Sequence, residues 1–205
     1  MRHNPKHAVD DELVVRRLIT ENPWATIVSQ NEGELVASHY PVLLDDEADG
    51  LAVVSHVGRP DEKVHGLGAG EVLLIVAGPH GYVSPSWYTE NDTPAPTWNF
   101  SVAHCYGTPQ ILEAGENLRV LTRLVDHFER HVESPVPLDP EVGARLARGT
   151  VGLRLPIDRF VCKVKMSQDK EEQSRRRVLE ELRGSGPYAH PALAADMARA
   201  LGEEG

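Results

Sequence analysis

Apolar and polar positions alternate with a period of two along several segments of the chain, a pattern typical of β-strands. We expect strands at residues 24–29, 35–44, 51–57, 71–77, 97–108, 150–155 and 160–166. A hairpin turn at residues 31–34 links the first two. The apolar run at 71–77 predicts a central strand that ends where Gly-Pro-His-Gly follows at residues 78–81. Many short strands joined by turns favour a mainly β architecture.

A helical period appears in fewer places. We expect helices at residues 59–70, 115–132, 141–148, 171–183 and 191–201, and one that opens at Asp10, Asp11 and Glu12 and ends at Pro23. The segment 115–132 is amphipathic, with Leu121 and Leu124 on its apolar face. Strands first and helices late indicate an α+β fold, a barrel with helical appendages.

Composition narrows the class of protein. The chain has 205 residues, 40% of them hydrophobic, and carries a net charge of -10. We expect no direct binding of nucleic acid, because phosphate contacts need a basic surface. Residues 175–177 are three consecutive arginines, which we interpret as the solvated face of a helix. No apolar run is long enough for a bilayer and two cysteines make no disulfide framework, so we expect a soluble, cytoplasmic protein without a membrane partner.

Three blocks of sequence resemble one known family. Residues 78–88 read Gly-Pro-His-Gly-Tyr-Val-Ser-Pro-Ser-Trp-Tyr. Residues 96–100 read Pro-Thr-Trp-Asn-Phe, followed by His104 and by Tyr-Gly-Thr-Pro at 106–109. Residues 163–170 read Lys-Val-Lys-Met-Ser-Gln-Asp-Lys. Together, and in this order, these blocks resemble the PaiB family.

The resemblance implies a split β-barrel of the FMN-binding type, with inserted and C-terminal helices. It also implies a homodimer with cofactor sites at the subunit interface. We expect a cofactor-binding domain at residues 1–168 and a helical appendage at 169–205. Founding members of the family are negative transcriptional regulators. A branch similar in sequence uses heme b to convert N5-hydroxy-L-ornithine into L-piperazate.

The chain departs from the family pattern after its third strand. The family reads Ala-Arg-Ala-Asn-Pro there, whereas residues 58–65 read Gly-Arg-Pro-Asp-Glu-Lys-Val-His. This segment would meet the FMN phosphate, so its change puts a simple FMN site in doubt. His65 in this segment is a candidate axial ligand for heme iron, or else an exposed helix residue. His56 competes with it, although we favour a structural hydrogen bond for His56. Lys63 and Arg59 are candidates for a propionate or a phosphate.

The remaining candidates come from the family blocks. Trp87 and Tyr88 would stack on a flat ring, and Ser84 and Ser86 would orient its polar edges. Tyr88 or His80 would serve as the catalytic acid. Lys165 and Gln168 would reach an anionic group, while strand-edge solvation is the alternative for Lys165. For two further side chains we favour burial over a role in the site. Trp98 is expected to pack in the core, and Cys105 to be a small buried hydrophobe.

Two classes of function follow. The first is a heme-dependent enzyme that closes the N–N bond of L-piperazate from a hydroxylamine amino acid. The second is an FMN-binding protein, either a regulator or a flavin-dependent oxidoreductase. The two differ in the cofactor that the purified protein would carry.

Overall fold

The computed structural model describes residue 1 and residues 3–203. Its strands are β1 (Ala8–Val9), β2 (Trp24–Asn31), β3 (Glu34–Pro41), β4 (Leu43–Leu44), β5 (Ala52–Gly58), β6 (Val72–Val83), β7 (Thr97–Gly107), β8 (Gln110–Ile111), β9 (Thr150–Pro156) and β10 (Arg159–Lys165). Its helices are α1 (Glu12–Glu21), α2 (Arg59–His65), the 3-10 helix η1 (Pro85–Trp87), α3 (Ala114–Glu129), α4 (Pro140–Gly149), α5 (Glu172–Arg183) and α6 (Pro191–Ala200). The mainly β, α+β architecture is therefore confirmed.

The chain forms two compact units. The first combines residues 1–10, 77–102 and 161–205, and the second combines residues 11–76 and 103–160. The strands form one sheet in the order β1-β10-β7-β6-β2-β3 and another in the order β4-β5-β9-β8. Both β6 and β7 continue from one unit into the other along the chain. We describe each unit by itself.

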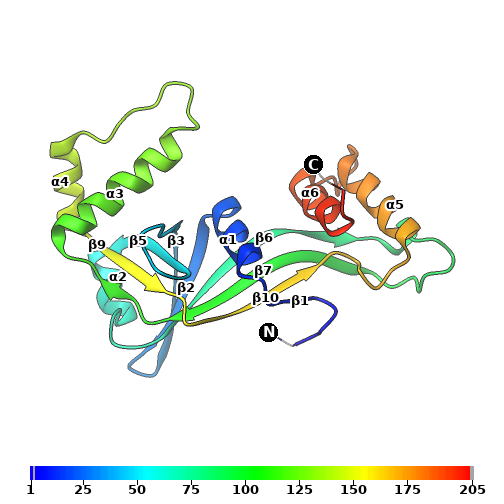
Figure 1. Ribbon diagram of the computed structural model, residues 1–205, viewed down its shortest axis with the longest axis horizontal. Helices are drawn as coiled ribbons and strands as arrows, with labels where there is room; N and C mark the ends of the chain where they lie inside the picture. The colour runs from blue at the N-terminus through cyan, green and yellow to red at the C-terminus, as the bar shows by residue number, and fades with distance from the viewer. Residues whose placement is uncertain (2, 204–205) are drawn as a thin grey trace. The chain divides into compact units, whose positions relative to one another are not determined.

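In the second unit, the four-stranded sheet is covered by α3 on one face. Antiparallel pairing of β5 with β9 places His56 opposite Gly152. A small core joins this sheet to α3 through Leu43, Val54, Val120 and Leu124. Figure 1 shows α3 and α4 next to each other beside β9. This face of β5 is also the one that carries His56, because side chains two residues apart share a face.

The β2–β3 hairpin of the second unit follows its sequence closely. The strands pair from Trp24 opposite Pro41 to Asn31 opposite Glu34. The two turn residues, Glu32 and Gly33, both have positive φ angles, 51° and 87°. A turn with two such residues matches the right-handed twist of the strands. The predicted hairpin is thus confirmed.

In the first unit, a helical hairpin packs on strand segments. Figure 1 shows α5 and α6 side by side. Their apolar faces share one core with residues of the central family block and of the closing block: Val83, Tyr88, Met166, Val178, Leu179, Leu182, Leu193 and Met197. At about 25 cal/mol for each Å² of apolar surface removed from water, such side chains contribute roughly 1.5–3 kcal/mol each. This core explains why α5 and α6 fold onto the strands.

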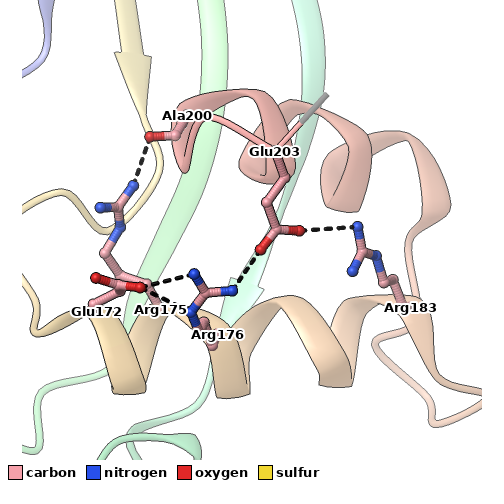
Figure 2. Close-up of polar contacts among 6 residues, drawn as sticks. All are labelled: Glu172, Arg175, Arg176, Arg183, Ala200 and Glu203. Atoms are coloured by element: carbon pink, nitrogen blue, oxygen red, sulfur yellow. Dashed lines mark hydrogen bonds and ion pairs between the residues drawn. The ribbon is translucent and has the colours of Figure 1, made fainter. Parts of the chain in front are cut away.

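The arginine run at residues 175–177 belongs to this packing (Figure 2). Arg175 donates to the backbone carbonyl of Ala200, and Arg176 bridges Glu172 and Glu203. Arg183 also pairs with Glu203. These partners hold the end of the chain against α5. Arg177 instead donates to the backbone carbonyl of Tyr88. The run lies on one helix, as predicted, but its side chains also bind neighbouring segments.

One strand prediction is wrong. Residues 78–81 do not break the strand, because β6 runs without interruption from Val72 to Val83. Pro79 has no N–H for a ladder bond, but β2 pairs only with residues 73–75 of β6. Proline is thus tolerated in β6 beyond the segment that β2 occupies. Across residues 1 and 3–203, no helix combines the length and apolar character needed to cross a membrane.

Candidate functional site

The predicted site residues fall into two groups, one in each unit. The second unit holds His56, Arg59, Lys63 and His65 on β5 and α2. The first unit holds the larger group: His80, Ser84, Ser86, Trp87, Tyr88, Lys165 and Gln168. The candidate residues thus form two local arrangements, one in each unit.

Helix α2 is fixed at both ends by residues of the β2–β3 hairpin. At its start, the Tyr40 hydroxyl accepts a hydrogen bond from the amide of Gly58 and donates one to Asp61. At its end, the side-chain amide of Asn31 donates to the carbonyls of Lys63 and Val64, and the Lys63 carbonyl also accepts from the backbone amide of Gly66. Gly66 ends the helix with a φ of 60°. The segment that departs from the family pattern is thus rigidly held.

His65 is buried between two serines of the hairpin. Its Nδ1 lies 2.8 Å from the hydroxyl oxygen of Ser29, and its Nε2 lies 3.0 Å from that of Ser38. The ring is only 3% exposed, which rules out the alternative of an exposed helix residue. Burial lowers its pKa, so the neutral ring prevails near pH 7, although Asp61 opposes the shift. Iron ligation by His65 would require one of the two hydrogen bonds to break.

His56 differs from His65 in its hydrogen bonding. Its Nδ1 is buried and has no hydrogen-bond partner among the residues that the structure describes. The structural hydrogen bond expected for His56 is therefore missing at this nitrogen. Burial alone lowers the pKa of His56 and favours the neutral imidazole. A neutral imidazole is the form that ligates heme iron, and ligation at Nδ1 of His56 would break no hydrogen bond, although α3 covers this face of β5.

The two basic side chains of α2 that were predicted to bind an anion, Arg59 and Lys63, differ in their contacts. The guanidinium of Arg59 donates to the carbonyls of Arg148 and Thr150, at 3.1 Å in each case. Both contacts lie at the junction of α4 and β9 and hold α2 to it. Lys63 is exposed. A propionate or phosphate near α2 would thus find an exposed ammonium at Lys63, whereas Arg59 already has two carbonyl partners.

In the first unit, the two serines of the central block shape its turn. The Ser84 hydroxyl accepts from the amide of Ser86 and lies 2.8 Å from its hydroxyl. Ser84 is in this way the N-cap of η1. Trp87 follows and packs its ring on the helical core. The structure therefore gives both serines a local partner, and their contact with a cofactor remains a prediction.

Tyr88 and His80, the candidate acids, lie in different surroundings. Tyr88 is 6% exposed within the helical core, and its hydroxyl has no hydrogen-bond partner in the described part of the chain. Burial, followed by Asp169, Asp92 and Tyr82, raises its pKa. Its phenol therefore stays protonated at neutral pH. His80 is exposed, and its Nδ1 lies 3.1 Å from the carbonyl oxygen of Gly78.

Lys165 and Gln168 are engaged by neighbouring segments. The ammonium of Lys165 donates to the Thr97 hydroxyl and, at 2.8 Å, to the carbonyl of Trp98. Burial lowers the pKa of Lys165, with Lys163 and Lys170 acting in the same direction and Asp169 against it. The side chain of Gln168 accepts from the amide of Met166 and lies 3.1 Å from Nδ1 of His7. Strand-edge solvation therefore does not describe Lys165.

One core prediction is wrong and another is confirmed. Trp98 is 54% exposed, because it lies on the outward face of β7 while its neighbour Asn99 is fully buried. Cys105 is fully buried, as expected for a small hydrophobe. Within residues 1 and 3–203, no three His, Cys, Asp or Glu side chains gather closely enough to hold a metal ion by themselves.

Sequence reasoning missed the serines that hold His65. Ser29 is buried and Ser38 half-buried on neighbouring strands, and both lie more than 25 positions before His65. Serine in a hairpin strand carries no signal of its own. Only the placement of α2 against the hairpin shows what these hydroxyls do.

Comparison with known proteins gives the family. Residues 1–159 match the family described as "Putative FMN-binding domain". The chain is 30% identical over 168 residues to "Protease synthase and sporulation protein PAI 2" of Bacillus subtilis, with 80% of each chain covered.

Two solved structures share the fold. One is the "FAD and Heme binding protein" from Mycobacterium smegmatis, with a TM-score of 0.62, 16% identity, and coverage of 82% of this chain and 78% of that chain. The other is the "Flavocytochrome Anf3" from Azotobacter vinelandii, with a TM-score of 0.61, 18% identity, and coverage of 81% and 73%. At these identities the likeness shows the fold alone.

Proposed function

Because the chain belongs to the family described as "Putative FMN-binding domain", of the PaiB type, we propose that it is an enzyme built around a planar aromatic cofactor. The cofactor that we propose is heme b, and the reaction is closure of N5-hydroxy-L-ornithine to L-piperazate. The enzyme would be cytoplasmic and would act as a homodimer on this small hydroxylamine amino acid.

The observation that carries the proposal is the buried, unpartnered nitrogen of His56. Leaving a buried polar atom without a hydrogen bond costs about 1–3 kcal/mol, and ligation of a bound group would offset this cost at His56. We assign His56 as the axial ligand and His65 as its alternative. Lys63 would meet a propionate. The fold is compatible with heme, since two proteins that share it are described as heme-binding or as a flavocytochrome.

The reaction balances without an external oxidant or reductant. The α-amine nitrogen of the substrate attacks N5, the N–O bond breaks, and the hydroxyl group leaves as water. A bound heme would supply Lewis-acid assistance to cleavage of the N–O bond. The chain's own part is to hold the two nitrogens in reactive geometry and to protonate the leaving oxygen. Of the two candidates for the proton donor we favour His80, which is exposed, over Tyr88, whose hydroxyl is enclosed in the helical core.

The test combines a spectrum with an activity assay. The purified protein, as isolated and after reconstitution with hemin, should show a Soret band. Incubated with N5-hydroxy-L-ornithine and no added reductant, it should release L-piperazate, detected by mass spectrometry. The His56→Ala variant should lose the Soret band, whereas His65→Ala should retain it.

Each outcome decides a separate part of the proposal. Absence of a Soret band after reconstitution overturns heme. A normal Soret band in His56→Ala, together with its loss in His65→Ala, moves the ligand to His65. A heme-loaded protein that leaves N5-hydroxy-L-ornithine unchanged rejects the substrate but not the cofactor.

The family itself favours a second candidate, an FMN-dependent oxidoreductase or an FMN-binding PaiB-type regulator. Lys63 and Lys165 would then be candidates for the phosphate. A yellow protein with the absorbance spectrum of a flavin, and no uptake of hemin, would favour this candidate. A regulator would need a partner for DNA contact, because the net charge of -10 disfavours direct binding.

A further inference from the structure

A cavity in the first unit is lined by residues from three segments. Gly81 and Tyr82 of β6 and Trp98 of β7 form one side, and residues 187–190, between α5 and α6, form the other. Its volume is about 340 Å³. Small-molecule pockets in proteins measure about 300–1,000 Å³. None of the lining residues belongs to the site proposed for heme at His56.

Aromatic rings dominate the lining of this cavity. The Tyr82 ring lies 6.3 Å from that of Trp98, edge to face, and 5.3 Å from that of Tyr188. Trp98 and Tyr188 are 54% and 51% exposed. Two large aromatic side chains that remain half-exposed beside a cavity leave apolar surface in water, which a flat ligand would cover.

The polar groups nearby indicate which ligand would fit. His190 accepts a hydrogen bond from the amide of Leu193 at Nδ1, so its neutral ring carries the proton on Nε2 and can donate. The Tyr82 and Tyr188 hydroxyls are further potential donors. The residues lining the cavity include no carboxylate, and the Lys165 ammonium is bonded to the carbonyl of Trp98. A cation would find only ring faces here, whereas the donors of His190, Tyr82 and Tyr188 favour a flat ring with acceptor atoms.

Part of this cavity lies outside the family match. Residues 187–190 come after the matched residues 1–159, whereas Gly81, Tyr82 and Trp98 lie within them. Gly81 leaves room for the second side, since a Cβ there would lie 2.9 Å from a terminal methyl carbon of Leu193. The C-terminal segment thus adds a wall that the matched part of the family does not contain.

We propose that this cavity binds a flat heteroaromatic ring that is neutral or anionic and rich in hydrogen-bond acceptors, held between Trp98 and Tyr188. Residues 187–190 determine which ring is admitted. The site is additional to the one proposed for heme, and it stands or falls independently of it.

Riboflavin is a suitable probe, because it has a flat ring with acceptor atoms and no phosphate. Binding to the full-length protein is measured by isothermal titration calorimetry. Choline, a small cation, is titrated in the same way as the comparison ligand. We expect riboflavin to bind and choline not to bind. Trp98→Ala should weaken riboflavin binding about tenfold, which corresponds to ~1.4 kcal/mol. The matched control is Trp24→Ala, since Trp24 is also exposed, at 64%, but belongs to the β2–β3 hairpin.

Tyr188→Ala provides the same test if Trp98→Ala does not fold, because Tyr188 lies in an exposed segment between helices. The proposal is overturned if the wild type does not bind riboflavin, if Trp24→Ala weakens binding as much as Trp98→Ala, or if choline binds more tightly than riboflavin. It is also overturned if Trp98→Ala leaves riboflavin affinity intact, because riboflavin then binds elsewhere in the chain. A change of oligomeric state by light scattering in the same variant would show that a second copy of the chain covers these rings.

Discussion

The imidazole Nδ1 of His65 lies 2.8 Å from the hydroxyl oxygen of Ser29, although 36 positions separate the two residues. This hydrogen bond is buried and joins α2 to the first strand of the hairpin. It connects the segment that departs from the family pattern to the rigid part of the second unit.

Replacing Ser29 by alanine should destabilise the protein. The change leaves Nδ1 of His65 buried without a partner, which costs about 1–3 kcal/mol. Urea unfolding followed by circular dichroism measures the difference. The matched control is Ser38→Ala, which removes the partner of Nε2 at a half-buried position and should cost less. If the two variants lost the same free energy of unfolding, the burial of the serine hydroxyl would not determine the cost of removing it.

Stability should fall on mild acidification. Burial lowers the pKa of His56 and of His65 in the folded protein. The unfolded chain therefore binds more protons than the folded one as the pH drops below about 6.5, and the free energy of unfolding decreases. Urea unfolding at several values between about pH 5 and pH 8 should show this slope. The pKa values of His7, His104 and His127 are lowered as well, so His65→Gln removes one of five titrating groups and should flatten the slope in part. An unchanged slope in the variant would contradict the assignment.

Asp45 is predicted to be a major ionic contributor to the stability of the second unit. Its side chain is fully buried and accepts hydrogen bonds from Arg154 and from the amide of Glu47. Burial alone would raise the pKa of Asp45, but these hydrogen bonds and the charges of Arg154 and Arg123 lower it overall. Its stabilisation is thus present above the ordinary pKa of an aspartate and is lost as the pH falls through the lowered value.

The Asp45→Asn variant should lose about 3 kcal/mol, the lower end for a broken buried pair, because Arg154 remains partly exposed. Thermal and urea unfolding at neutral pH measure the loss. Glu12→Gln is the control, since it breaks the exposed pair with Arg16 on α1 and should cost well under ~1 kcal/mol. A similar loss in both variants would argue against the special role of Asp45.

Gly107 in the second family block should not tolerate a side chain. A Cβ at this position would lie 1.9 Å from the carbonyl oxygen of Pro156, which is backbone and cannot turn away. Gly107→Ala should therefore cost at least ~3 kcal/mol or prevent folding. Gly50→Ala is the matched control, because a Cβ there has no neighbour within 4 Å. Soluble yield and thermal unfolding of the two variants provide the comparison. A stable Gly107→Ala protein would show that β7 can move away from Pro156 of β9.

The sequence by itself determined those features that depend on neighbours along the chain. The start of α1 near Asp11, the hairpin turn at Glu32 and Gly33, and the long strand that became β7 follow from local backbone and side-chain preferences. Such preferences act over a few residues, so a reader of the sequence can evaluate them directly. The family blocks likewise indicated the fold, since each block is an uninterrupted stretch of sequence.

Tertiary structure alone decided what each candidate side chain contacts. His65 is buried because Ser29 and Ser38 come from strands far earlier in the chain, and Tyr88 is in a core because α5 and α6 return to cover it. Trp98 remains exposed on β7, and β6 continues through Pro79 because β2 pairs with it only at residues 73–75. Burial and hydrogen bonding depend on groups that folding brings together from distant positions, and no local pattern contains that information.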